Sequence, residues 1–239
     1  MKLRLLAAAT LVAMTLATGA VAAQDTTSEK GKLSYAIGYK TGIDLAQLMA
    51  SGEQVDINTV IKALQDAVAR KDPAVPADQL RTAIQNMQKR QIAKAKAEFE
   101  KLAAENKTKS DAFMAQNKAK SGVKTLPSGV QYKVIEAGGG AKPVQASQVT
   151  IEYKGTLPDG RVIIDTAQAG PNQPAGPVPI KVSEVPLAGL REALLMMPTG
   201  ARWEVAIPGG DKGYGSGPEA GEMANQAVIF NLKLVSIQK

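Results

Sequence analysis

Two stretches in the C-terminal half of the chain place the strongest constraint on its fold. Residues 149–160 read VTIEYKGTLPDG, an alternating strand pattern closed by a Pro-Asp-Gly turn. Residues 227–237, AVIFNLKLVSI, carry apolar side chains at every second position. Because successive side chains of a strand point to opposite faces, each stretch predicts a strand that buries one face. A chain with two such strands needs a sheet around them.

The surrounding sequence predicts the rest of that sheet. Strand patterns occur at 130–136, 161–166, 180–185 and 201–208, and one convincing helix pattern, LAGLREALLMM, occurs at 187–197. Residues 167–179 contain four prolines and two glycines, which predicts a flap without regular structure. The expected architecture is α+β, a mainly antiparallel sheet of five or six strands with one short helix against it. An apolar pocket is expected between that helix and the concave face of the sheet.

Three helices are predicted before the sheet. The first covers residues 33–50 and is interrupted by Gly38 and Gly42, whose spacing allows two helix backbones to approach closely. The second follows a cap at Asp56, and the third runs from about residue 77 towards 120, roughly 60 Å long at ~1.5 Å per residue. Its apolar stripe is thin, so its second half is expected to be a solvent-exposed connector. The small apolar surface favours a dimer over a monomer with a loosely folded N-terminal region.

The composition excludes several kinds of chemistry. The chain has no histidine and no cysteine, which removes the commonest general base, thiolate catalysis and the usual metal ligands, so no metal or cofactor is expected. The net charge of +7 comes largely from residues 80–120, with ten Lys/Arg against four Asp/Glu. Only two aromatic residues, Phe99 and Phe113, lie among those lysines, so the pattern is typical of a solvated helix and not of a nucleic-acid-binding surface.

The first 23 residues have the pattern of a secretory signal peptide. Lys2 and Arg4 precede a short apolar run, and small residues follow, which predicts cleavage after Ala22 or Ala23. The run is shorter than the roughly 20 residues of a membrane span, and no later stretch is apolar enough to insert in a membrane. The sequence therefore predicts an exported, periplasmic protein, with association with the cell surface left open.

The order of short motifs along the chain resembles that of the FKBP-type peptidyl-prolyl isomerases. These motifs are DG, EAL, MPTG, IP, GYG and NQAVIF, and LSYAIGY and LPSGVQYKVIEAG are similar to the macrophage infectivity potentiator group of that family. The resemblance implies a half-barrel isomerase domain at 122–239. It also implies a signal peptide at 1–23, a dimerisation segment of short helices at 24–76 and a connecting helix at 77–121.

The resemblance also implies an activity that needs no acid, base, metal or cofactor. Amide resonance creates the barrier to rotation about an X-Pro bond and puts partial charge on the carbonyl oxygen. An apolar pocket removes the water that stabilises this charge and favours the twisted state. The expected function is peptidyl-prolyl cis-trans isomerisation in unfolded or Pro-containing exported polypeptides, by a homodimer. The alternative is a non-catalytic or weakly catalytic dimeric chaperone on the same fold.

The pocket residues that the resemblance implies fall into two groups. The expected catalytic residues are Tyr153, Asp165, Tyr214 and Phe230. The expected substrate-binding residues are Ile163, Ile164, Ile180, Pro186, Leu187 and Leu190. The chain departs from the family where a Phe-Asp pair becomes residues 162–165, either with one residue too many or with Ile164 in the Asp position, and where the floor tryptophan becomes Leu190. Since Leu lacks the flat face of an aromatic ring, weak or altered activity is expected.

Overall fold

The computed structural model describes residues 25–170 and 174–238. The predicted signal peptide at 1–23 lies outside these residues. The chain divides into two compact units, one ending at Met87 and the other beginning at Gln88. Within the described ranges, no helix combines the length and the apolar character needed to cross a membrane.

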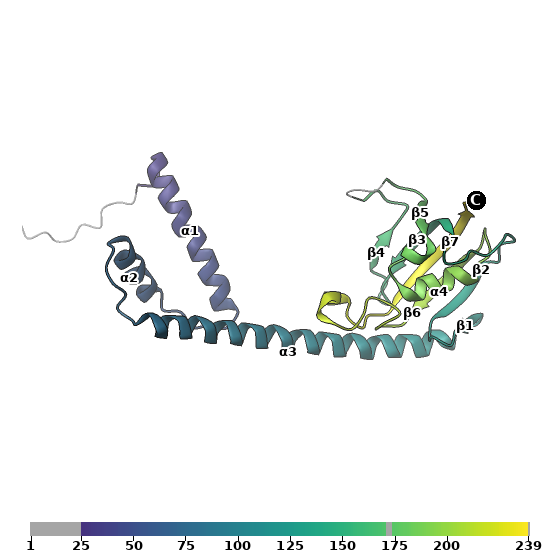
Figure 1. Ribbon diagram of the computed structural model, residues 1–239, viewed down its shortest axis with the longest axis horizontal. Coiled ribbons are helices and arrows are strands. Elements are labelled where there is room, and N and C mark those ends of the chain that lie inside the picture. Colours follow the sequence, from purple (N-terminus) through teal and green to yellow (C-terminus); the bar gives the residue numbers. More distant parts are fainter. Residues whose placement is uncertain (1–24, 171–173, 239) are drawn as a thin grey trace, which may run out of the picture. The chain divides into compact units, whose positions relative to one another are not determined.

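The first unit consists of helix α1 (Glu29–Ala50), helix α2 (Ile57–Val68) and the first turns of helix α3 (Ala77–Lys118) (Figure 1). The predicted cap of α2 is confirmed, because the Asp56 carboxylate accepts a hydrogen bond from the Thr59 N–H. A Cβ built on Gly38 or Gly42 would meet nothing within 4 Å. These glycines are therefore not required by packing within the described chain.

The second unit is built on a seven-stranded antiparallel sheet with strand order β1-β2-β6-β7-β3-β4, and β5 pairs with β3. The only α-helix that lies between strands in the described chain is α4 (Ala188–Met196). The predicted α+β class, an antiparallel sheet with one short helix after an all-α N-terminal part, is thus confirmed. The strands are β1 (Val123–Thr125), β2 (Gln131–Glu136), β3 (Gln148–Thr156), β4 (Val162–Asp165), β5 (Val178–Lys181), β6 (Arg202–Ile207) and β7 (Val228–Ile237).

Two elements differ from the predicted ones. Strand β1 is absent from the sequence prediction, because three residues between a Gly and a Pro give no readable alternation. The strand expected at 180–185 ends at Lys181, since its ladder partner β3 begins at Gln148, opposite Lys181. Beyond that pair the backbone turns into a short 3₁₀ helix at Val182–Glu184, and a second one, Pro218–Met223, lies in the long loop before β7.

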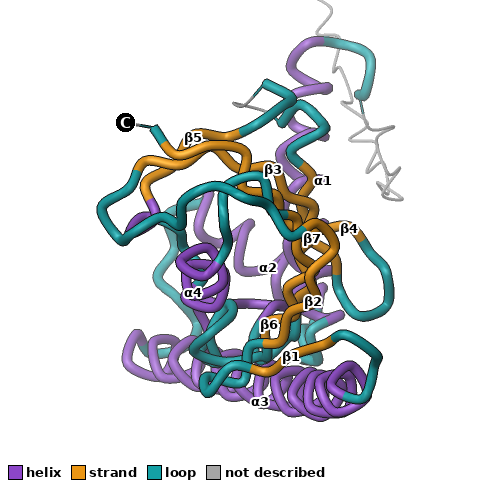
Figure 2. Tube along the Cα trace, turned by 90° about the vertical axis from the view of Figure 1, so that its right-hand side faces the viewer, coloured by secondary structure: helices purple, strands orange, loops and turns teal. Residues whose placement is uncertain are grey.

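The core lies between α4 and one face of the sheet (Figure 2). Strand β7 contributes the alternating positions that the sequence predicted, with Val228, Phe230, Leu232 and Leu234 all buried. Leu194 of α4 is fully buried against them. This face of the sheet is therefore apolar along its length, and the site described below opens from it.

The second half of α3 packs on the opposite face of the sheet. The sequence had instead predicted that this half of the helix would be a solvent-exposed connector. Met114 is buried in a small cluster with Ala206 and Ala227, and Phe113 and Ile229 lie at its edge. The buried positions of α3 are spaced by three or four residues and are mostly small or polar: Ala103, Asn106, Ser110, Met114 and Asn117. This face of the helix is thus as much a part of the second unit as the strands are.

Candidate active site

An apolar pocket of about 150 Å³ opens between α4, strands β3–β5 and β7, and the loop before β7. Strand β3 places alternate side chains on this face, so Ile151 and Tyr153 both line it. All ten lining side chains are apolar or tyrosine: Ile151, Tyr153, Ile164, Ile180, Val185, Pro186, Leu187, Leu190, Tyr214 and Phe230. The pocket can therefore hold a small apolar group away from water.

Glycine at position 155 allows the aromatic wall to form. A Cβ at Gly155 would lie 2.8 Å from the Phe230 ring and 2.8 Å from the Ile164 side chain. Any larger residue would push these side chains apart. With glycine present, Phe230 meets the Tyr153 ring edge to face, with centroids 6.0 Å apart and an interplanar angle of 64°.

The floor of the pocket is tied to the loop that carries Tyr214. The Gly189 N–H at the start of α4 donates a 2.8 Å hydrogen bond to the Lys212 carbonyl, two residues before Tyr214. A Cβ at Gly189 would lie 2.7 Å from Ile207 and 3.1 Å from that carbonyl, so close approach requires glycine here. Leu190, the next residue, is buried and forms part of the floor.

The electrostatics of the pocket keep both tyrosines neutral. Burial raises the pKa of Tyr153 above its ordinary 10.0. Burial also raises the pKa of Tyr214, and the charge that Tyr153 would carry raises it further. No carboxylate, ammonium or guanidinium group is among the described residues that line the pocket. The site can therefore desolvate a bound group and offer phenolic hydroxyls, but it has no acid–base pair for proton transfer.

Eight of the ten sequence-predicted site residues line this pocket: Tyr153, Ile164, Ile180, Pro186, Leu187, Leu190, Tyr214 and Phe230. Ile151 and Val185 also line it and were not predicted. The alternation of β3 could have indicated Ile151, which lies two residues before Tyr153. Ile163 is partly buried against the core but does not line the pocket.

A bulge in β4 explains why Ile163 does not line the pocket. It also leaves Asp165 outside the pocket, where a catalytic carboxylate was expected. Gly155 pairs with Ile164 and the next residue of β3 pairs with Val162, so Ile163 is the extra residue. Ile164 therefore faces the pocket. Asp165, paired with Lys154, lies on the other face of the sheet, because neighbouring strand residues point to opposite sides.

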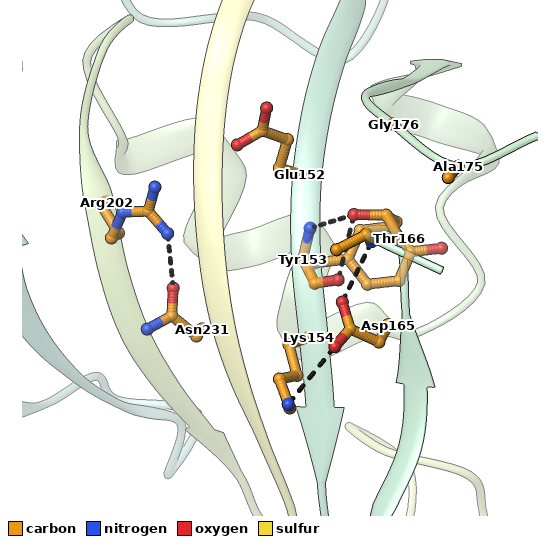
Figure 3. Close-up of a pocket in the computed structure, with 10 residues that line it drawn as sticks. Glu152, Tyr153, Lys154, Asp165, Thr166, Ala175, Gly176, Arg202 and Asn231 are labelled. Carbon is orange, nitrogen blue, oxygen red and sulfur yellow. Dashed lines mark hydrogen bonds and ion pairs between the residues drawn. The ribbon is translucent and has the colours of Figure 1, made fainter. Parts of the chain in front are cut away.

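On that other face Asp165 belongs to a polar groove (Figure 3). Its carboxylate accepts a 3.0 Å hydrogen bond from the Ala167 N–H and pairs with the Lys154 ammonium at 3.3 Å. The hydrogen bond from the Ala167 N–H has the largest effect, and together with the Lys154 ammonium it holds the pKa of Asp165 below its ordinary value. The carboxylate thus fixes the start of the flap and does not reach the apolar pocket.

The other two charged side chains that line the polar groove, Arg202 and Glu152, also have partners of opposite charge nearby. Arg202 contacts Glu136 at 3.1 Å and donates to the Asn231 side chain, and Lys233 lies 4.0 Å from Glu152. Across the described part of the chain, no group of three or more His, Cys, Asp or Glu side chains could hold a metal ion. The apolar pocket, and not this groove, is therefore the better candidate for an active site.

The fold and the pocket together define a class of protein: an α+β half-barrel with an apolar pocket and no proton-transfer groups in it. Residues 30–134 match the family described as domain amino terminal to FKBP-type peptidyl-prolyl isomerase. Residues 139–235 match FKBP-type peptidyl-prolyl cis-trans isomerase. The chain belongs to the FKBP-type peptidyl-prolyl cis-trans isomerases.

Three relatives match this chain over most of its length. It is 40% identical over 243 residues to outer membrane protein MIP of Legionella longbeachae, covering 100% of this chain and 99% of that protein. It is 35% identical to peptidyl-prolyl cis-trans isomerase Mip of Coxiella burnetii, covering 95% of each. The crystal structure of FkpA from Escherichia coli aligns with a TM-score of 0.64 at 26% identity, covering 89% of this chain and 98% of that one.

Proposed function

We propose that the chain is a periplasmic peptidyl-prolyl cis-trans isomerase that assists the folding of exported proteins, with the apolar pocket as its active site. The observation that supports this most is the geometry of the pocket. Eight side chains that the family resemblance singled out converge on one cavity large enough for a proline ring. Its walls are aromatic on one side, at Tyr153 and Phe230, and aliphatic on the other.

The chemistry follows from desolvation. A trans X-Pro amide is planar because resonance moves charge onto its carbonyl oxygen, and water stabilises that charge. When the proline ring enters the pocket, the amide loses this water, so the twisted state, which carries less charge, is favoured. Tyr214 is 36% exposed at the rim, where its hydroxyl can donate a hydrogen bond to the backbone of the substrate. No proton needs to be transferred.

The proposed location rests on the sequence pattern and on the names of the relatives. Residues 1–23 have the charged, apolar and small-residue regions of a signal peptide, with cleavage after Ala22 or Ala23. One relative bears the name outer membrane protein MIP. We place this chain in the periplasm, where its clients would be unfolded or Pro-containing polypeptides.

We further propose that α1 and α2 form a homodimer interface. Large apolar side chains along both helices are left exposed, which is costly for a folded unit in water. On these helices they are Leu33, Tyr35, Ile37, Tyr39, Ile43, Met49, Ile57, Ile61, Leu64 and Val68, with exposed fractions from 42% to 85%. Gly38 and Gly42 lie among them with open space beside them, as close approach of a partner helix would require.

The glycine positions give a direct test of the dimer. Gly38→Leu should favour α1 in the monomer, since Gly costs ~1 kcal/mol against residues such as Leu or Ala in a helix. The same side chain should hold a partner helix away, so we expect dimer affinity to fall at least about tenfold, equivalent to ~1.4 kcal/mol. Sedimentation of the chain from residue 24 onward measures this.

Gln47→Leu is the matched control for Gly38→Leu. Position 47 is nine residues further along α1, about half a turn around the helix at 100° per residue, and is exposed. It adds the same side chain away from the glycines and should leave the dimer intact. A Gly38→Leu chain that dimerises like the parent would exclude a glycine-mediated interface.

The Asp165 carboxylate offers a test of which face of the sheet acts on the substrate. Asp165→Asn should leave kcat/KM for a proline-containing peptide within about twofold of the parent, because its ion pair with Lys154 lies outside the pocket. Ile164→Asp, one residue away, should lower kcat/KM strongly, because it places a charge in the apolar pocket. A tenfold loss of kcat/KM for Asp165→Asn with an intact fold would show that this carboxylate belongs to the active site.

The proposed function as a whole is tested by proline-limited refolding of a model protein, with and without this chain. We expect catalysis in proportion to chain concentration, and loss of catalysis when Phe230 in the pocket wall is replaced. Suppressed aggregation without any acceleration of the slow phase would instead support the alternative, a dimeric chaperone that uses the fold only for binding.

A further inference from the structure

The loop at 209–226, called here the Tyr214 loop, is held at both ends by the buried face of α3. At its start, the Gly209 N–H donates a 3.1 Å hydrogen bond to the Ser110 hydroxyl. At its end, the Asn106 side-chain amide donates to the carbonyls of Glu222 and Ala224, both at 3.0 Å. Asn106 is 6% exposed, so these hydrogen bonds are shielded from water.

The end of the loop is connected in turn to Tyr214. The Asn225 N–H donates a 2.9 Å hydrogen bond to the Gly215 carbonyl, next to Tyr214, and the Asn225 side chain donates to the Ala103 carbonyl of α3 at 3.3 Å. Asn225 has a left-handed backbone with φ of 58°, and its carbonyl is packed against Gly209. The two ends of the loop therefore touch each other and α3 at one place.

The turn that carries Tyr214 has few other supports. Gly210 and Gly215 form an isolated bridge around it, and the Lys212 carbonyl accepts from Gly189. Five glycines lie between 209 and 217, so the local backbone is permissive and needs external contacts to hold one conformation. The contacts to α3 provide them.

We propose that Asn106 is a positioning residue for substrate binding: it holds the Tyr214 loop so that Tyr214 stays at the rim of the pocket. This inference rests on the proposed role of the pocket. Asn106 touches neither the pocket nor the substrate, and acts through the hydrogen bonds to Glu222 and Ala224 and through the bond between Asn225 and Gly215. The connecting helix thereby takes part in substrate recognition, beyond its role as a spacer.

Because Tyr214 lies at the rim and not in the core of the pocket, loosening it should weaken substrate binding more than turnover. For Asn106→Ala in the full chain we expect KM for a proline-containing peptide to rise about fivefold, within the range expected for losing one or two hydrogen bonds, with kcat within about twofold. Ser110→Ala, which removes one acceptor at the start of the loop, should raise KM less.

Asn117→Ala is the matched control. Asn117 is buried on the same face of α3 at 3% exposure, but its amide donates to the Gln131 side chain of β2, away from the Tyr214 loop. This variant should lower the stability of the fold by a similar amount and leave KM unchanged. Equal rises in KM for Asn106→Ala and Asn117→Ala would show that both act only by loosening the helix.

A double-mutant cycle separates this inference from the proposed active site. If Asn106 acts through Tyr214, Asn106→Ala should add almost nothing to KM in a Tyr214→Ala background. Full additivity of the two changes would overturn the inference. If Tyr214→Ala alone leaves catalysis unchanged, the proposed role of Tyr214 in the pocket fails as well. Fluorescence of Trp203, a buried core residue and the single tryptophan, reports whether each variant is folded, and Ser110→Ala carries the same test should Asn106→Ala unfold.

Discussion

Replacement of Phe230 by leucine is expected to lower kcat/KM for a proline-containing peptide at least about tenfold, equivalent to ~1.4 kcal/mol of transition-state stabilisation. Phe230 is buried and forms the aromatic wall with Tyr153. Leucine keeps the wall apolar but removes the flat face against which a proline ring can lie. The change should cost about 0.5–3 kcal/mol of stability, as most single substitutions do, so the fold should persist. A coupled peptide assay with a cis-proline substrate gives the rate.

Two further variants show which property of the wall matters. Tyr153→Phe removes a hydroxyl but keeps the ring, so a mechanism dominated by desolvation predicts a loss of no more than about threefold. Phe113→Leu repeats the same substitution on α3, on the other face of the sheet. It should leave the rate unchanged. If Phe230→Leu were as active as Phe113→Leu, the apolar pocket would not be the site of isomerisation.

The parts of the site that could be predicted are those in which chain order and strand alternation suffice. The family motifs indicated Tyr153, Tyr214 and Phe230, and the alternation of β7 correctly placed Phe230 on its buried face. The order of the family motifs also indicated that the pocket floor is formed by the residues just before α4 and at its start. Leu190 of this floor stands where the family has a tryptophan. Each of these assignments needs only the sequence neighbours of the residue.

The position of Asp165 could not be obtained in this way. A single extra residue in β4 moves every later side chain to the opposite face, and four consecutive residues, VIID, contain no signal for where the bulge lies. The bulge is set by the pairing of β4 with β3, where Gly155 leaves room for Ile164. The site of the carboxylate therefore depends on a contact between strands and not on local sequence.

The docking of α3 was missed for a different reason. Its buried face contains Asn106, Ser110 and Asn117, which a search for apolar periodicity counts as exposed positions. Their spacing of three and four residues is helical, but the polarity conceals it. These side chains are buried because each one meets a polar partner on the sheet or the Tyr214 loop. Only the tertiary structure supplies those partners.

The packing of α3 predicts that a chain beginning at Gly122 will be much less stable than one beginning at Gln88. The shorter chain loses the burial of Met114 and the hydrogen bonds of Asn106, Ser110 and Asn117. At ~1.5–3 kcal/mol for a buried Met and ~0.5–1.5 kcal/mol for each of the four hydrogen bonds, the loss is about 3.5–9 kcal/mol. Urea unfolding followed by Trp203 fluorescence measures the difference.

A loss of that size is a large part of the roughly 5–15 kcal/mol by which domains are ordinarily stable, so the shorter chain should be partly unfolded at about 37 °C. Met114→Ala in the chain from Gln88 removes the apolar contact alone and should account for about 2–5 kcal/mol. Equal unfolding midpoints for the chains from Gly122 and Gln88 would contradict the packing described here. Weak isomerisation by a shortened chain that lacks residues 88–121 should therefore be attributed first to the missing helix face, and only after that to the aliphatic residues of the pocket.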